Sequence, residues 1–272
     1  MSSQNPPTAL VTGVSSGIGR ATAQALKAEG YRVFGTSRQA ATGDEVEGIE
    51  LVRLDVGDEQ SVLQAVDVVL AKTGRIDLLV NNAGYGVMGA AEESSIEQAE
   101  AIFDTNLFGV IRMIKAVLPT MRTQKSGRII NMSSVLGLIP SPYMALYSAS
   151  KHALEGYSES LDHEVRGQGI RVILVEPAYT KTSFEENIVV ADTPLLYYRE
   201  ANRSIKDLLT GVMATADAPK IVADVVVKAA ASVKPRLRYT AGAKARSVSR
   251  LRRFVPQAFF DKAFRAEMKL DA

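Results

Sequence analysis

Tyr147 and Lys151 stand four residues apart in the stretch YSASKHALEGYSESL, residues 147–161. Four residues make about one helical turn, so in a helix the phenol and the ammonium lie on one face, within reach of one reacting group. A positioned phenol gives or takes a proton, and a nearby cation favours its ionised form. The pair is therefore a candidate for acid–base chemistry.

The phenol needs help for that chemistry, because its ordinary pKa of about 10 is poorly matched to neutral pH. A cation about 4 Å away, at an effective dielectric constant of about 20, favours the phenolate by about 4 kcal/mol. That free energy corresponds to roughly three pKa units. The spacing thus predicts that Lys151 lowers the pKa of Tyr147.

Composition excludes several other kinds of site. The chain of 272 residues has no cysteine and only two histidines, His152 and His163, so disulfides, thiolate nucleophiles and a metal centre are not expected. Its 32 basic and 30 acidic residues nearly balance, which argues against a nucleic-acid partner. The stretch MSSQNPPTALVTG lacks a basic, apolar leader, and no apolar run reaches about 18 residues. We expect a cytoplasmic protein without a transmembrane segment.

Short β-branched apolar runs alternate with amphipathic helical patterns along the chain. The runs are TALVT, YRVFGT, GIELVRLDV, IDLLVNNAG, SGRIINMSS and GIRVILVEP, and a seventh strand is expected in PRLRYTAG. Helices are expected over residues 58–74, with Asp58 as N-cap and Gly74 at the end, and over residues 93–121. This alternation predicts an α/β protein with one Rossmann-fold domain over residues 1–272, a doubly wound parallel sheet of about seven strands flanked by helices.

The first predicted strand runs into TGVSSGIGR, with glycines at 13, 17 and 19. At a strand-to-helix turn such glycines permit a tight bend and let backbone N–H groups approach a pyrophosphate at the helix N-terminus. A glycine-rich turn without a ligand is the alternative.

Five motifs in register carry a family resemblance: TGVSSGIG, NNAG at 81–84, Asn106 in TNLFG, Ser134 in NMSSVLG, and YSASK. Over roughly residues 8–185 the chain resembles the short-chain dehydrogenase/reductase family, and its KHALEGYSESL stretch is most similar to hydroxysteroid and retinol dehydrogenases within it. The resemblance implies an oxidoreductase that interconverts a hydroxyl and a carbonyl group with a nicotinamide cofactor. A nucleotide-sensing protein without turnover and a membrane-associated structural protein are the alternatives.

The same resemblance implies roles for four residues. Tyr147 is the acid/base, and Lys151 also holds the nicotinamide ribose hydroxyls. Ser134 bonds the substrate oxygen, and Asn106 keeps a water relay to the lysine. Ser133 adjoins Ser134, but strand alternation and the spacing to Tyr147 favour Ser134. Taken singly, these residues have local alternatives as turn, cap or solvated side chains.

Cofactor choice is expected at the end of the second strand, where an acid binds the ribose 2′-hydroxyl of NAD and an arginine accommodates a 2′-phosphate. Ser37 stands where the acid would be and Arg38 follows, so we infer NADP(H) in preference to NAD(H); an Arg38 lying in solvent is the alternative. Asp55 is either the adenine-contacting aspartate or a helix cap. The expected cofactor-binding residues are Gly13, Ser15, Ser16, Gly17, Ile18, Gly19, Arg38, Asp55, Val56, Asn82, Ala83, Gly84, Tyr147, Lys151, Pro177, Thr180 and Thr182.

One motif departs from the family pattern. Relatives have PGxxxT after the sixth strand, whereas this chain has EPAYTKT, with Pro177 and Thr182 in place but Ala178 for glycine. If the backbone there has a positive φ, alanine costs on the order of 1 kcal/mol. Only the geometry around the nicotinamide carboxamide is then affected.

Residues 183–215 correspond to the substrate-covering segment of similar proteins. This segment offers Phe184, Leu195, Leu196, Tyr197, Tyr198 and Met213. An apolar lid indicates a lipophilic substrate. Packing of these side chains on the body of the domain or on a partner subunit is the alternative.

The C-terminal extension, residues 234–272, has a different composition. From Lys234 to Arg253 its charges are all positive, and an aromatic stretch follows. The phenylalanines dock on the domain or cover the active-site mouth, or they belong to an amphipathic helix in peripheral contact with anionic lipid. The resemblance further implies a homodimer or homotetramer.

Overall fold

The computed structural model describes residues 6–41, 43–184 and 187–267. Eight strands of these residues form the main sheet, in the order β10-β8-β7-β5-β1-β2-β4-β3. They are β1 (Thr8–Val11), β2 (Arg32–Ser37), β3 (Glu45–Val46), β4 (Ile49–Arg53), β5 (Leu78–Asn81), β7 (Gly127–Met132), β8 (Ile170–Pro177) and β10 (Arg238–Ala241).

The seven predicted strands are confirmed, and all seven are parallel. The eighth, β3, was not expected: it is a two-residue strand that pairs antiparallel with β4 at the sheet edge. Glu47 and Gly48 connect the two strands, with φ of 54° and 72°. Positive φ at both central residues is typical of a tight hairpin turn.

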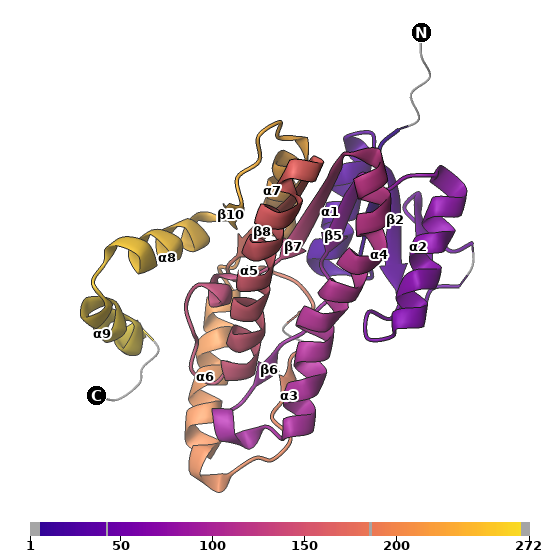
Figure 1. The fold of residues 1–272 in the computed structure, drawn as a ribbon. Coiled ribbons are helices and arrows are strands. Elements are labelled where there is room, and N and C mark those ends of the chain that lie inside the picture. The colour runs from indigo at the N-terminus through magenta and orange to yellow at the C-terminus, as the bar shows by residue number, and fades with distance from the viewer. Residues whose placement is uncertain (1–5, 42, 185–186, 268–272) are drawn as a thin grey trace.

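Helices cover both faces of the sheet (Figure 1). One face carries α1 (Gly17–Ala28) and α7 (Pro219–Ala231), and the other carries α2 (Glu59–Thr73), α4 (Gly109–Gln124) and α5 (Ala145–Val165). The strand β1 is buried on both sides, since Ala9 and Val11 pack in one core cluster and Leu10 in the other. This is the predicted doubly wound fold.

Helix boundaries follow the predicted signals. The Asp58 side chain accepts a hydrogen bond from the Gln60 N–H and begins α2, and Gly74 ends that helix with φ of 67°. The helix predicted over residues 93–121 is present as α3 (Ile96–Phe103), the π-helical turn η2 (Asp104–Phe108) and α4. Ser95 caps α3 through a hydrogen bond from the Gln98 N–H. The π turn, which the sequence pattern did not indicate, contains Asn106.

Most of the remaining elements lie around the carboxyl ends of the strands or at the C-terminus, whereas η4 (Arg166–Gln168) directly precedes β8. They are β6 (Val87–Met88), β9 (Val189–Val190), α6 (Arg199–Met213), α8 (Ala243–Phe254), α9 (Gln257–Glu267), and the 3-10 turns η1 (Ala91–Glu93), η3 (Val135–Gly137), η4 and η5 (Leu196–Tyr198). Helices α8 and α9 project from the side of the body in Figure 1. Within the described residues, no helix has both the length and the apolar character needed to cross a bilayer.

Candidate active site

A cavity of about 1330 Å³ opens where the carboxyl ends of the parallel strands meet the glycine turn. Ligands of open α/β sheets bind at this edge, beside the point where the strand order reverses. Every residue predicted from the sequence for catalysis or cofactor binding lines the cavity, with the single exception of Asn106. The fold thus brings motifs from residues 13 to 182 around one space.

The glycine turn has the geometry of an anion cradle. Gly13 and Gly17 have φ of 70° and 60°, and a side chain on Gly19 would overlap the Gly13 carbonyl oxygen. The Asn82 amide donates to the carbonyls of Thr12 and Gly13, both at 3.0 Å. Since the N-terminus of α1 also faces the cavity here, these residues fit the pyrophosphate of a dinucleotide.

The far end of the cavity is lined by residues that follow β2 and β4. Ser37 and Arg38 lie beside Asp55, and the Arg38 side chain is exposed. The Asp55 carboxylate accepts a hydrogen bond from the Gly57 N–H at 2.9 Å, whereas Asp58 caps α2. The interpretation of Asp55 as the helix cap is therefore wrong.

Tyr147 is buried at the centre of the cavity wall. Burial raises the pKa of its phenol to about 12, and a hydrogen bond with the Ser134 side chain acts in the opposite direction. The ring of Phe184 packs against it, with 5.6 Å between the ring centroids. Ser134 thus lies beside the phenol, while the adjacent Ser133 faces Glu155.

The prediction that Lys151 lowers the pKa of Tyr147 is wrong. The Lys151 ammonium lies 5.6 Å from the centre of the Tyr147 ring and donates to the Met132 carbonyl at 2.8 Å. Burial lowers the pKa of Lys151 to about 8, and the negative charge of Glu155 partly opposes this. Desolvation, which a distance-based argument leaves out, is the largest influence on both pKa values.

Asn106 is fully buried and takes no part in lining the cavity. Its side-chain oxygen accepts from the Tyr85 N–H at 3.1 Å, and its amide donates to the Tyr85 carbonyl at 2.9 Å and to the Ser150 hydroxyl at 3.2 Å. Asn106 therefore ties the loop after β5 to α5. Gly84 lies between Asn106 and Lys151, since an added Cβ would be 2.9 Å from the Asn106 oxygen and 3.8 Å from the Lys151 nitrogen.

A buried acidic cluster behind Lys151 was missed by the sequence analysis. Arg238 donates to Glu155 and Glu159, both at 2.9 Å, and lies 3.5 Å from Glu176. Burial, and then the charge of Glu155, raise the pKa of Glu176 to about 8. The spacing of Glu155, four residues after Lys151, could have indicated that the two side chains lie on one helical face. The contact of Glu155 with Arg238 of β10 had no such signal in the sequence.

The segment that follows β8 closes over the glycine turn. Ala178 does not have a positive φ, so the departure from the family's glycine imposes no backbone strain here. Thr182 lies close to Gly17, where an added Cβ would be 3.0 Å from the Thr182 side chain. The Ser16 and Ser183 hydroxyls are 2.6 Å apart and connect the turn to the next segment.

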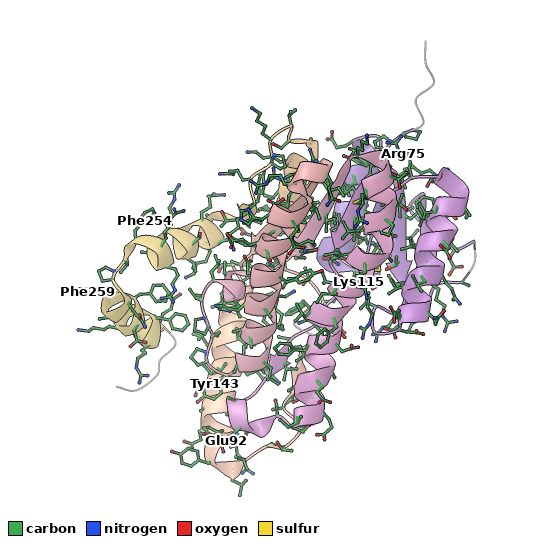
Figure 2. All side chains as sticks on the ribbon, viewed as in Figure 1. Arg75, Glu92, Lys115, Tyr143, Phe254 and Phe259 are labelled. Atoms are coloured by element: carbon green, nitrogen blue, oxygen red, sulfur yellow. The ribbon has the colours of Figure 1, made fainter. Side chains whose placement is uncertain are left out.

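The apolar side of the cavity differs in part from the prediction. Phe184 and Met213 line it as expected, together with Ile188 and Leu209. The other four predicted residues, Leu195, Leu196, Tyr197 and Tyr198, do not line it. Leu196 and Tyr197 are 77% and 84% exposed, because η5 lies at the far end of the molecule beside Glu92, which accepts a hydrogen bond from the Tyr198 hydroxyl (Figure 2).

The C-terminal helices supply a further apolar wall. Val248, Leu251 and Val255 recur at helical spacing and line the cavity. The lining residues of the aromatic stretch are Phe259, Phe260 and Phe264. Phe254 points outward and is 75% exposed (Figure 2). Residues 185 and 186 of the predicted substrate-covering segment and residues 268–272 of the C-terminal extension lie outside the described part of the chain.

Neither histidine forms part of the cavity wall. His152 is exposed, and its Nδ1 lies 2.9 Å from the Ser148 carbonyl oxygen, within the same helix. Among the described residues, no cluster of three or more histidine, cysteine, aspartate or glutamate side chains has a geometry that could hold a metal ion.

Comparison with known proteins assigns the family. The sequence model of the short chain dehydrogenase family matches residues 7–192. The chain belongs to the short-chain dehydrogenase family. It is 36% identical to retinol dehydrogenase 8 of Bos taurus over 256 residues, which cover 86% of this chain and 80% of that protein.

Other members support the same assignment. A 3-ketodihydrosphingosine reductase of Bacteroides thetaiotaomicron is 45% identical over 182 residues, 67% of each chain. The crystal structure of a short-chain dehydrogenase from Streptomyces avermitilis superposes with a TM-score of 0.82 at 32% identity, covering 99% of this chain and all of that one.

Structurally similar members of the family bind either dinucleotide. A member from Burkholderia phymatum was solved with NAD (27% identity, TM-score 0.79, 93% and 95% coverage), and ElxO with NADP (26% identity, TM-score 0.74, 89% and 99% coverage). Membership of the family therefore does not decide between NAD and NADP, and the residues around the cofactor site must do so.

Proposed function

We propose that this short-chain dehydrogenase uses NADP(H) to interconvert a hydroxyl and a carbonyl group on a lipophilic small molecule. The observation that supports this most is the position of the Ser134 side chain beside the buried Tyr147 phenol, in a cavity that also reaches the glycine turn and Arg38. One space then receives the dinucleotide at one end and the reacting oxygen at the other.

The preference for NADP(H) rests on Ser37 and Arg38. A carboxylate at the position of Ser37 would repel a 2′-phosphate, whereas the exposed guanidinium of Arg38 offers it a bidentate partner. Because Arg38 lines the cavity and is free of burial, it can adjust to the phosphate.

Tyr147 is the proposed acid and base. A nicotinamide cofactor held at the glycine turn would supply the hydride, and the Tyr147 hydroxyl would donate its proton to the alkoxide that develops on the substrate. The Ser134 hydroxyl donates a hydrogen bond to that oxygen and stabilises its negative charge. The proposed role of Lys151, whose ammonium donates to the Met132 carbonyl, is to hold the ribose hydroxyls, and Asn106 positions the loop after β5 beside it.

The proposed substrate is lipophilic because the wall opposite the cofactor residues is apolar. Phe184, Ile188, Leu209 and Met213 form it on one side, and the stripe from Val248 to Phe264 on the other. A bulky alcohol, ketone or aldehyde buries its apolar part there. The cytoplasmic location, the homo-oligomer and the peripheral lipid contact stay predictions.

NADPH oxidation, followed by absorbance with a panel of aldehydes and ketones that includes steroids and retinal, tests the function. The matched variant is Tyr147→Phe, which keeps the buried ring and its packing against Phe184. We expect turnover that prefers NADPH over NADH and falls by at least about a thousandfold in the variant. Tight NADPH binding without turnover of any compound would contradict the proposal and favour a nucleotide sensor.

A further inference from the structure

The segment that covers Tyr147 is held at its far end by a buried carboxylate. Phe184 packs on the Tyr147 ring, the chain then forms β9, and β9 pairs with β6. After β9, the chain passes alongside Glu93, an earlier residue of the sequence that is only 1% exposed. Glu93 does not line the cavity, so it contacts neither substrate nor cofactor there.

Three N–H groups converge on the Glu93 carboxylate. One oxygen accepts from the Leu195 N–H at 2.8 Å, and the other from the Ala90 N–H at 2.8 Å and the Asn202 amide at 2.7 Å. All three donors are uncharged, so hydrogen bonds alone compensate for the loss of water. Burial opposes the charged form, but these bonds together hold the pKa of Glu93 below its usual value.

Neighbouring residues add further bonds between the same two stretches of chain. The Glu93 carbonyl accepts from both the N–H and the hydroxyl of Thr193, at 2.8 and 2.6 Å. Asp192 accepts from the Ser95 N–H and hydroxyl at 2.8 and 2.6 Å. The Gln98 amide donates to the Val190 carbonyl at 2.9 Å. Residues 93–98 therefore hold residues 190–202 against the body of the domain.

These bonds reach the cavity directly. Ile188, Val189 and Asp192 line the cavity, and so does Gln98, which belongs to the residues 93–98 that hold this segment. A shift of residues 190–202 would move this wall relative to the Tyr147 ring, while the glycine turn and Arg38 lie at the other end of the cavity.

We propose that Glu93 is a positioning residue that fixes the segment 188–202, whose residues Ile188, Val189 and Asp192 line the substrate side of the cavity. Its effect on substrate rests on the proposed function, whereas its effect on the order of the segment does not. The hydrogen bonds of Glu93 already order this wall before substrate enters the cavity.

The Glu93→Gln substitution tests this role directly, because hydrogen-bond donors surround both carboxylate oxygens of Glu93. The Leu195 and Ala90 N–H groups point at different oxygens, so a glutamine amide must face one of them with its own N–H groups. Asn202 can rotate its amide to adapt, but the backbone cannot. A milder variant, Asn202→Ala, removes one donor only, and Glu97→Gln is the control, since Glu97 is exposed.

The experiment combines hydrogen exchange with steady-state kinetics on the full chain. In Glu93→Gln we expect exchange at residues 189–202 to accelerate by at least about tenfold, with the strands of the main sheet unchanged. We also expect KM for the carbonyl substrate to rise by about tenfold, while KM for NADPH stays within about twofold. Asn202→Ala should show the same changes in smaller measure, and Glu97→Gln none.

Three results would overturn the proposal. The first is unchanged exchange at residues 189–202, and the second is exchange that rises equally across the main sheet, which indicates general destabilisation. The third is faster local exchange with an unchanged KM for the substrate. If no carbonyl compound is turned over by the wild type, the proposed function fails, and the exchange data still decide whether Glu93 orders this segment.

Discussion

Lys151 and Tyr147 share one face of α5, yet the Lys151 ammonium lies beside the Tyr147 ring, 5.6 Å from its centre, and donates to the Met132 carbonyl. Both side chains are buried, and burial favours the uncharged phenol of Tyr147 and the uncharged amine of Lys151. The proton chemistry of the pair therefore depends on charge that arrives with the cofactor and substrate.

The pH dependence of alcohol oxidation follows from this arrangement. Oxidation requires the Tyr147 phenolate, and burial raises the pKa of that phenol to about 12. Between about pH 6 and 8 we expect kcat/KM to rise by up to about tenfold per pH unit, because the phenolate fraction rises in that proportion. The rise should flatten above about 8, where Lys151 loses its proton. A kcat/KM that does not change with pH would contradict the acid–base role.

Replacement of Lys151 by methionine should separate stability from activity. The pKa of Lys151 is lowered by burial from 10.5 to about 8, so the unfolded chain binds more protons than the folded one between these values. The ammonium therefore opposes folding at neutral pH, and its penalty fades as the pH rises. We expect Lys151→Met to lose turnover but to gain on the order of 2 kcal/mol in unfolding free energy at pH 7.

Denaturant titrations at pH 7 and at about pH 10 check this prediction. The difference between variant and wild type should shrink at the higher pH. A variant that is destabilised at pH 7, or equally stabilised at both values, would show that the buried charge is not the cause.

Cofactor preference can be tested at Arg38. We expect Arg38→Leu to raise KM for NADPH by roughly 10- to 100-fold, because a charge-assisted contact with the 2′-phosphate is lost, and to change KM for NADH by less than about threefold. Arg53→Leu is the matched control, since Arg53 is exposed at the end of the neighbouring strand β4 and does not line the cavity. Equal changes for both cofactors would place Arg38 in solvent.

The acidic cluster around Arg238 gives a stability prediction. Burial and the charge of Glu155 raise the pKa of Glu176 to about 8, well above its value in the unfolded chain. The stabilising contribution of the protonated form is complete below about pH 4.3 and is lost as the pH rises through 8. We expect Glu176→Gln to raise the unfolding free energy at pH 8 by a few kcal/mol, with little change near pH 4.

Glu159→Gln is the comparison for this prediction, because the hydrogen bond with Arg238 lowers the pKa of Glu159. Its replacement should leave stability unchanged or slightly reduced at pH 8. The same response of both variants in denaturant titrations would exclude a protonated Glu176.

The sequence by itself determined the seven parallel strands, the glycine turn and the place of Tyr147 and Lys151 on one helical face. These features depend on local periodicity and on residue types whose spacing survives folding. The residues predicted to bind the cofactor, from Gly13 to Thr182, line one cavity at an edge of the parallel sheet.

Only the tertiary structure decided how buried each of these groups is and what it touches. Burial reversed the expected direction of the Tyr147 pKa, and the π turn η2 aimed Asn106 at Tyr85 and Ser150, away from the cavity. Arg238 meets Glu155 across 83 residues of sequence, and Glu93 meets Asn202 across 109. Such contacts depend on which distant segments come together and how much water they exclude, and neither quantity is encoded in local spacing.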